Sequence, residues 1–476
     1  MYRVKRAALF AALESIEEET FSMNKKLIAL AVGGALAPGL ALAQPASVTP
    51  TAIAQPAGVA SNAGITLYGR LDETIMYDKF STNFNGSVLD FKKGDVLSPG
   101  NAMGVRGRED LGGGTSAWFQ LEIGVWPSER LDTSATTGNN WGGRNSAVGF
   151  TSNIGDILIG NWDTPYKVTY GVWNSVTSGG FSAAGVTMGN FDSTGALNNA
   201  LCTNTVSNAT GTVTTATNGV CVTEAAANAN AFSRRVNNSV QYWTPIMSGF
   251  QVKLMTAMAP YQSPGNAQFP SGLPKAQEYS ANATWARGPL SLGFGYDYHK
   301  GLRPGTAVGA EPNPKDSAWQ LAGKWNFGPG EIGVGYEVLS YGNNAAGNAT
   351  STGMDVPTWV VNGRWNIGPG AVWASYSASD TKSCTSGNVI QSAACGAKAK
   401  EYSIGYDYVL SKRTKLYVAY NKIDNGIVTN SSGAAVTGSS YYYIAGPAAN
   451  VGNGTSGGLS PGTDVTTMGV GVQHLF

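Results

Sequence analysis

Charged side chains are scarce in this chain, and no internal stretch has the roughly 20 consecutive apolar residues that a transmembrane helix requires. Charged residues make up 13% of the 476 residues, about half the share found in soluble proteins. Glycine, with 63 residues, is near twice its usual share. These features exclude a bundle of membrane helices. They leave two classes of protein, a large secreted β-protein and an outer-membrane β-barrel.

Residues that commonly build catalytic and metal sites are also few. The only two histidines, His299 and His474, are far apart in the sequence, and the four cysteines include no CxxC pair. The sequence contains no nucleophile elbow and no phosphate-binding loop, and Gly112-Gly113-Gly114 is interpreted as a turn. We therefore expect no enzyme, no metal site and no cofactor. Lysine and arginine are scattered and form no basic tail, so we expect no nucleic-acid partner.

The amino-terminal region has the features of an export signal. Met23-Asn24-Lys25-Lys26 is a short basic segment, an apolar stretch follows, and Ala41-Leu42-Ala43 is a small-residue cleavage site. Four glutamates upstream of Met23 are untypical of such a signal, so that part is interpreted as mis-assigned sequence. The stretch after the cleavage site is rich in Ala and Pro and is expected to be flexible. The expected order is an upstream extension (1–22), a signal peptide (23–43), a flexible leader (44–64) and a β-barrel (65–476).

The four cysteines lie in two long polar stretches, one containing Cys202 and Cys221 and the other Cys384 and Cys395. After export to an oxidising compartment, the nearest-neighbour pairs Cys202–Cys221 and Cys384–Cys395 are the expected disulfides. Four cysteines allow three pairings, and the sequence does not decide among them. Each bridge would restrain its loop by roughly 2–4 kcal/mol.

The clearest secondary-structure pattern spans residues 102–122, where two alternating stretches flank the glycine turn. Phe119 and Leu121 alternate with polar residues, and this period of two indicates a strand. A soluble sandwich would bury the apolar face, whereas a membrane barrel directs it to lipid and the polar face to a water-filled lumen. The polar face of this hairpin carries Arg106, Arg108 and Glu122.

Short turns and long polar stretches alternate along the rest of the chain, and we count sixteen strands. This asymmetry is typical of an outer-membrane barrel with its short turns on the periplasmic side. Trp325 and Trp365 each precede a Gly-Pro-Gly turn, where an aromatic girdle would lie at the lipid headgroups. Two of the long stretches are expected to be loops, namely 79–100 and 163–234.

Several of these stretches resemble the Gram-negative outer-membrane general porin family, in particular its neisserial members. The family pattern R-x-G-x-[KR]-G-x-E-D-L-G-G-G-x-x-A-x-F-x-L-E is similar to residues 102–122. Two positions depart from the family, since Ala102 and Asn161 stand where it has or often has Arg. Further similarity lies at 65–72, 143–165, 235–251 and 466–476.

The resemblance implies an all-β protein, a transmembrane antiparallel barrel of about sixteen strands with a long third loop folded into the pore. It also implies a homotrimer in outer-membrane lipid, and a final strand ending in Phe476 that the barrel-assembly machinery reads. The implied function is passive diffusion of small hydrophilic solutes and ions. Two alternatives remain, a substrate-selective channel on the same barrel and a non-conducting structural or adhesive barrel.

The residues expected to line the pore or its constriction are charged side chains on polar strand faces and in the third loop. Arg70 shares a strand face with Tyr68 and Asp72. Strict alternation places Arg144 on the apolar Val148 face unless a bulge intervenes. Three arginines facing few acids would favour anions. The expected pore residues are Arg70, Arg106, Arg108, Glu122 and Asp192.

Overall fold

The structure is a computed structural model, and it describes residues 64–84, 87–128, 142–176, 178, 180–184, 187–189, 232–258, 277–300, 315–341, 354–380, 398–425 and 464–476. The expected upstream extension, signal peptide and cleavage site lie outside the described residues. So do the leader up to residue 63, all four cysteines and Asp192.

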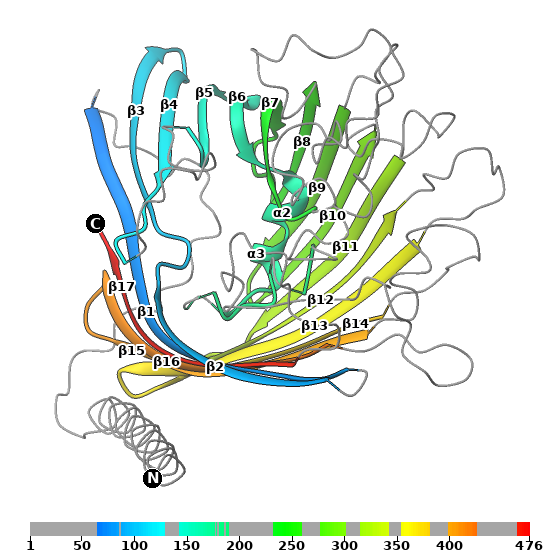
Figure 1. The fold of residues 1–476 in the computed structure, drawn as a ribbon. Coiled ribbons are helices and arrows are strands. Elements are labelled where there is room, and N and C mark those ends of the chain that lie inside the picture. The colour runs from blue at the N-terminus through cyan, green and yellow to red at the C-terminus, as the bar shows by residue number, and fades with distance from the viewer. Residues whose placement is uncertain are drawn as a thin grey trace, which may run out of the picture.

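The described residues form one closed antiparallel sheet (Figure 1). The closing pair is β1 with β17, in which Asp72 lies opposite Gln473. The strands are β1 (Gly64–Phe84), β2 (Ser87–Leu97), β3 (Ala102–Gly112), β4 (Thr115–Gly124), β5 (Ser146–Ser152), β6 (Gly155–Asp163), β7 (Arg235–Trp243), β8 (Phe250–Met258), β9 (Gln277–Arg287), β10 (Leu290–Lys300), β11 (Lys315–Asn326), β12 (Gly330–Tyr341), β13 (Met354–Ile367), β14 (Gly370–Asp380), β15 (Lys398–Val409), β16 (Thr414–Asn425) and β17 (Asp464–Leu475).

The segments β2 and β3 are two halves of one barrel strand. Residues 74–84 of β1 pair with β2, and residues 64–70 of β1 pair with β3. Counted as one, they give sixteen barrel strands, which confirms the prediction of a sixteen-stranded antiparallel barrel.

The expected loop over 79–100 is wrong for most of its length. The first strand, β1, continues to Phe84, and β2 begins at Ser87 and pairs with it. Among the described residues of this stretch, 98–101 interrupt the pairing. There Gly100 has a φ of 68°, a conformation that glycine adopts without strain. The side-chain Oδ1 of Asn101 accepts a hydrogen bond of 2.5 Å from the backbone N of Asp72, which replaces a missing ladder bond.

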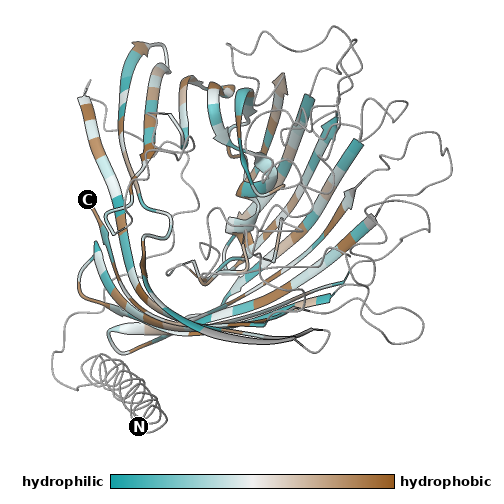
Figure 2. Ribbon diagram, viewed as in Figure 1, coloured by the Kyte–Doolittle hydropathy of each residue, from teal (hydrophilic) through white to brown (hydrophobic). Residues whose placement is uncertain are grey.

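Hydrophilic and hydrophobic residues alternate along the strands of the barrel (Figure 2). In β8, Phe250, Leu254 and Met258 are exposed, whereas Gln251 and Lys253 between them are buried. Exposure of large apolar side chains along strand after strand identifies the outer face as the lipid face. None of the helices in the described part of the chain is long and apolar enough to cross a membrane.

Aromatic side chains gather on the outer face beside the short turns. Trp325 and Trp365 are 54% and 49% exposed, so they are not core residues of a sandwich. The ring of Phe327 lies between them, 5.0 Å from Trp325 and 5.8 Å from Trp365 between ring centroids. This is the position expected for an interfacial aromatic girdle.

Candidate functional site

The segment after β6 turns into the barrel through two short helices, α2 (Pro165–Val168) and α3 (Tyr170–Trp173) (Figure 1). Thr164 starts the turn, because its hydroxyl accepts a hydrogen bond from the backbone N of Lys167 at 3.1 Å. Pro165 at the first helical position fits the same start. The described residues between 165 and 189, here called the inner segment, lie against the inner faces of β9 to β16.

Glu337 on β12 is the main polar anchor of the inner segment. It is completely buried and accepts three hydrogen bonds from that segment. The hydroxyls of Tyr166 and Tyr170 donate to Oε2 at 2.8 and 3.1 Å. The backbone N of Gly189 donates to Oε1 at 2.6 Å. One wall carboxylate therefore ties together both ends of the described inner segment.

Other inward side chains continue this attachment around the wall. They come from β9, β11, β13, β14 and β15, so the inner segment crosses half of the barrel. Most of these bonds engage the backbone of the inner segment, which fixes its path rather than single side chains. The pairs are Asn282 Nδ2 to Pro165 O (3.0 Å), Gln320 Nε2 to Tyr166 O (2.7 Å), Lys324 Nζ to Asn174 O (2.9 Å), Ser175 N to Asn362 Oδ1 (3.0 Å), Ser178 Oγ to Asp407 Oδ1 (2.6 Å) and Thr187 Oγ1 with Ser377 Oγ (2.6 Å).

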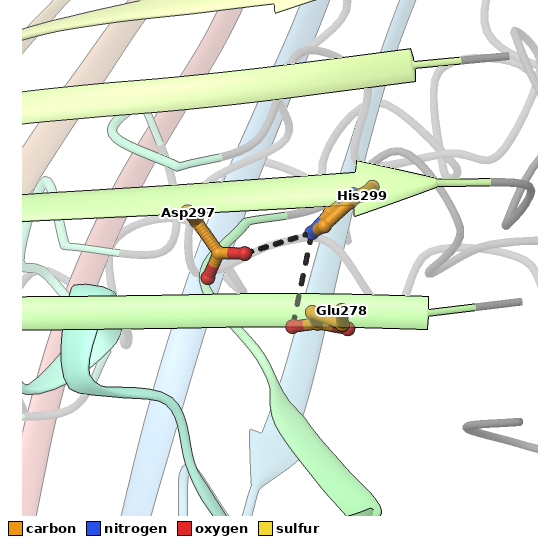
Figure 3. A group of neighbouring side chains, drawn as sticks. All are labelled: Glu278, Asp297 and His299. Carbon is orange, nitrogen blue, oxygen red and sulfur yellow. Dashed lines mark ion pairs between the residues drawn. The ribbon is translucent and has the colours of Figure 1, made fainter. Parts of the chain in front are cut away.

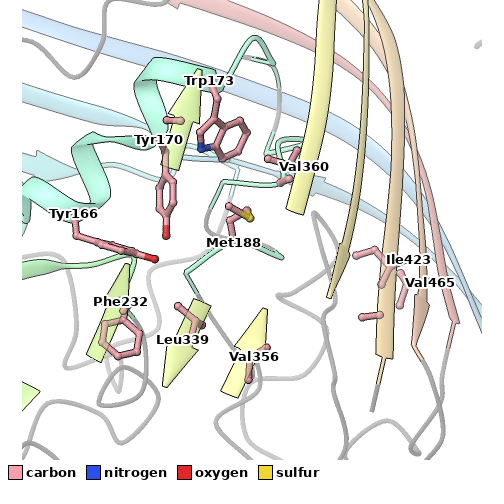
Figure 4. Close-up of a cluster of buried hydrophobic side chains, with 14 of the residues drawn as sticks. Tyr166, Tyr170, Trp173, Met188, Phe232, Leu339, Val356, Val360, Ile423 and Val465 are labelled. Atoms are coloured by element: carbon pink, nitrogen blue, oxygen red, sulfur yellow. The ribbon is translucent and has the colours of Figure 1, made fainter. Parts of the chain in front are cut away.

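Apolar contacts support the same arrangement (Figure 4). Tyr166, Tyr170 and Trp173 project from the helices in successive edge-on contacts, with ring centroids 5.8 Å apart in each pair. They form a buried cluster with wall residues that include Leu339 and Val360. Burial of these aromatic rings gives the inner segment a core of its own inside a polar lumen.

The wall has glycine where the inner segment approaches it most closely. A Cβ at Gly333 on β12 would overlap the carbonyl oxygen of Trp173 and lie 2.8 Å from its carbonyl carbon. Backbone atoms cannot rotate away, so the position requires glycine. A Cβ at Gly335, on the same face, would lie 2.9 Å from the indole side chain of Trp173.

We expect Gly333→Ala to displace the inner segment and destabilise it by about 1–3 kcal/mol, because the added methyl overlaps backbone. Protease sensitivity of the folded barrel and single-channel conductance measure this displacement. The matched control is Gly323→Ala on β11, whose Cβ would lie at ordinary distances of 3.5 and 3.7 Å from its neighbours. Equal protease sensitivity and equal conductance of the two variants would contradict close packing of the inner segment at Gly333.

Basic side chains occupy the wall formed by β1, β3 and the start of β5. The Cζ of Arg106 lies 4.9 Å from the ring centroid of Tyr68, a cation–π distance. Arg106 and Arg108 form no ion pair with a carboxylate among the described residues. Arg70 also faces inward, and its guanidinium donates to the carbonyl of Gly100. The charges of Arg106 and Arg108 are therefore available to solutes in the lumen.

Glu122 on β4 lies beside these arginines and is held from both sides. The Tyr68 hydroxyl donates to its Oε2 at 3.0 Å, and Arg144 Nε donates to its Oε1 at 2.6 Å. Strict alternation would place Arg144 on the Val148 face, but the alternation of β5 does not extend to this residue. Arg144 precedes β5, and its backbone N donates to the carbonyl of Glu122 at 3.1 Å, which turns the side chain inward.

A second charged group lies where the inner segment leaves the wall. Asp163 is fully buried and has two cationic partners, Lys167 Nζ at 2.8 Å and Arg235 Nε at 3.3 Å. Burial lowers the pKa of Lys167 to about 8. Asp163 opposes that shift, while the positive charges of Arg235 and Arg144 add to it. These cations are therefore close enough to repel one another.

Taken together, these side chains form what we call the basic wall, in which cations outnumber carboxylates. Alternation in single strands predicted the inward direction of Arg70, Arg106, Arg108 and Glu122. It did not reveal Lys167, Arg235 or Glu337, because their partners lie on distant segments. The basic wall comprises six cations, Arg70, Arg106, Arg108, Arg144, Lys167 and Arg235, and three carboxylates, Asp72, Glu122 and Asp163.

Comparison with known proteins gives a family match over most of the chain. A family model described as Gram-negative porin matches residues 28–427. The chain is similar to the major outer membrane protein P.IB of Neisseria gonorrhoeae, with 32% identity over 119 residues, or 25% of this chain and 32% of that protein. The protein of the same name from Neisseria lactamica is 29% identical over 116 residues, 24% of this chain and 32% of that protein. The chain thus spans about a third of the length of these relatives.

Solved structures share the fold over most of the chain. An anion-selective porin from Comamonas acidovorans has a TM-score of 0.57 and 22% identity, covering 87% of this chain and 100% of that one. Outer-membrane expressed OmpT of Vibrio cholerae has a TM-score of 0.52 and 13% identity, covering 88% and 99%. At these identities the likeness concerns the fold.

Proposed function

The chain belongs to the Gram-negative porin family, and we propose that it forms a water-filled channel for passive diffusion of small hydrophilic solutes and ions across the outer membrane. The observation that carries this proposal is the closed barrel whose outer face is apolar and whose inner face carries the basic wall. A lumen lined by charged and amide side chains is suited to hydrated solutes.

The inner segment narrows the lumen in this proposal. It is attached to the inner faces of β9 to β16, and the other residues of the basic wall lie on β1, β3, β4, β6 and β7 and just before β5, so solutes pass between them. Lys167 belongs to the inner segment itself and lies where that segment leaves the wall. The charged side chains of the basic wall then face the narrowest part of the path. Residue Asp192 of the same loop lies outside the described residues, and its place in the constriction remains a sequence-based proposal.

The basic wall favours anions in this channel. Its six cations exceed its three carboxylates, and Arg106 and Arg108 have no carboxylate partner in the described part of the chain. Positive potential in a narrow aqueous path raises the local concentration of anions and lowers that of cations. We propose a mild preference for small anions over cations of similar size.

A substrate-selective channel is the second candidate, and the packing of the inner segment favours it. Bulky aromatic side chains and a continuous set of wall hydrogen bonds hold that segment inside the lumen. A rigid constriction discriminates among solutes of similar size better than a mobile one. Uptake rates of sugars and amino acids of graded size into liposomes distinguish the candidates, since general diffusion depends smoothly on size.

The anion preference is expected to fall as the pH rises through about 8. A lysine is positive below its pKa, so Lys167 is charged at neutral pH and loses that charge above its pKa of about 8. Tyr166 and Tyr170 do not contribute, because burial raises their pKa values well above the usual value. The anion preference is measured as the reversal potential in a salt gradient at pH values from about 7 to about 9, and we expect it to fall over this range.

Two variants at Lys167 separate its effect from other titrations. Lys167→Arg keeps the positive charge throughout, so its anion preference is expected to stay constant over this pH range. Lys167→Met lacks the charge and is expected to show the lower preference at every pH. An unchanged pH dependence in both variants would show that another group titrates.

We further propose a homotrimer whose apolar outer faces contact lipid and neighbouring copies. Phe476 lies at the seam that closes the barrel, where its backbone N and O bond to Gly69 at 3.1 Å each. A Cβ at Gly69 would come within 2.7 Å of the Phe476 ring, so the ring packs directly on this glycine. This exposed aromatic end is suited to recognition by the barrel-assembly machinery.

Planar-bilayer recording of the folded, membrane-extracted protein tests the proposed function. Stable conductance steps, together with uptake of small sugars into liposomes that contain the protein, are the expected result. A folded barrel that inserts into the bilayer but passes no current would contradict the channel. That result would favour a structural or adhesive barrel.

A further inference from the structure

Three ionisable side chains meet inside the barrel at the ends of β9 and β10 (Figure 3). His299 lies directly opposite Glu278 in the strand pairing, and Asp297 lies two residues earlier on the same inward face. All three side chains are fully buried. One potential ligand atom from each lies within 4.8 Å of the other two. The strand register therefore converges two carboxylates and one imidazole on one point.

The separations within this cluster suit metal ligands better than direct ion pairs. Nε2 of His299 is 3.3 Å from Oδ1 of Asp297 and 3.7 Å from Oε1 of Glu278. A charge-assisted hydrogen bond is shorter, about 2.7–2.9 Å. Two ligand atoms bound tetrahedrally to Zn²⁺, each about 2.0–2.2 Å from the metal, lie about 3.3–3.6 Å apart. The cluster thus leaves room for an ion between its members.

Asp297 gives an independent indication of a bound cation. Its side chain is completely buried, and neither carboxylate oxygen has a hydrogen bond of good geometry among the described residues, with only weak contacts to Ser280 and to the backbone of Tyr298. A buried carboxylate without hydrogen bonds is costly unless a cation compensates it. Its oxygen Oδ1 is the atom that lies closest to the His299 imidazole in the cluster.

Arg234 and Phe232 supply the supporting interactions that metal sites commonly have. Arg234 donates to both carboxylate oxygens of Glu278, through a terminal nitrogen to Oε2 and through Nε to Oε1 at 3.4 Å, and Oε1 also lies 3.7 Å from Nε2 of His299. The Phe232 ring stacks on the His299 imidazole with centroids 4.3 Å apart and an interplanar angle of 18°. Such contacts fix the orientation of a metal-binding carboxylate and imidazole.

We propose that Glu278, Asp297 and His299 bind one divalent transition-metal ion of the zinc type. A mixed set of one imidazole and two carboxylates suits Zn²⁺ and related ions, whereas Ca²⁺ and Mg²⁺ prefer oxygen ligands alone. Phe232 and Arg234 immediately precede β7, so the ion fixes the point at which the long loop rejoins the wall. Zinc therefore stabilises the return of the loop.

Zinc content of the folded, full-length protein tests this site. The protein is stripped with chelator, dialysed against Zn²⁺ and analysed for bound metal. We expect about one Zn²⁺ per chain in the wild type, and at least about a tenfold loss of affinity in Asp297→Asn and His299→Ala. Cobalt binding in the wild type is expected to give the visible absorption of a tetrahedral site.

His474→Ala is the matched control, because His474 is the only other histidine and its Nδ1 contacts Thr414 on the exposed outer face. It is expected to bind zinc as the wild type does. Asp297→Asn preserves shape, so it keeps the test valid if His299→Ala does not fold, and heat-modifiable gel migration reports folding. Absence of stoichiometric zinc in the wild type would overturn the site. Equal zinc binding in all variants would also overturn it, since the metal would then lie elsewhere, such as at cysteines.

Discussion

Replacing Arg106 with alanine is expected to lower the anion preference of the channel several-fold. The guanidinium faces the lumen and has no carboxylate partner among the described residues, so its charge acts directly on passing ions. Without this charge, an anion that passes about 5 Å away in a water-like medium loses about 1 kcal/mol of attraction. The local concentration of anions at this point then falls roughly fivefold. Arg106→Glu is expected to change the preference about twice as much in free energy.

Reversal potentials in a KCl gradient measure this change. The matched control is Arg287→Ala, which removes the same charge from an exposed position at the periplasmic end of β9. It is expected to leave ion preference unchanged. Wild-type selectivity in a properly folded Arg106→Ala channel would remove Arg106 from the constriction, while leaving the barrel and the proposed channel intact.

Replacing Glu337 with alanine is expected to release the inner segment from the wall. Three buried donors, the hydroxyls of Tyr166 and Tyr170 and the backbone N of Gly189, lose their shared acceptor. Each unsatisfied buried donor costs about 1–3 kcal/mol, so the attachment weakens by about 3 kcal/mol or more. We expect larger and noisier conductance, and faster uptake of large sugars into liposomes.

The control for this variant is Glu331→Ala on the same strand and the same face. Glu331 lies 3.6 Å from Lys324 Nζ and forms no hydrogen bond with the described residues of the inner segment. Both variants should migrate as folded barrels, because the strand ladders of β12 are backbone bonds. Quiet, wild-type conductance in a folded Glu337→Ala channel would contradict the view that the inner segment sets the pore size.

Much of the barrel is readable from the sequence because a membrane wall imposes one simple rule on every strand. Phe119 and Leu121 must face lipid while Gln120 and Glu122 face water, and this alternation appears directly in the chain. The rule weakens where strands extend beyond the bilayer. Residues 79–97 contain many polar side chains and were therefore predicted as a loop, although backbone pairing continues through them.

The site is less predictable because its interactions join segments that are distant in sequence. The alternation of side chains within one strand gives the inward direction of Arg106. No local sequence pattern, however, connects Glu337 with Tyr166, which lies 171 residues earlier. The same holds for Glu278 and His299, which become neighbours only through the register of β9 and β10. Arg144 does not follow the alternation of β5, because it precedes that strand and its side chain turns toward Glu122.

The reversal potential of the wild-type channel in a KCl gradient shows whether solutes pass beside the basic wall, in which cations outnumber carboxylates. We expect a potential of the sign given by anion-selective pores, and we expect it to weaken with added salt because exposed charges are screened. A cation-selective potential would contradict it, since acidic groups elsewhere in the loop would then control the path.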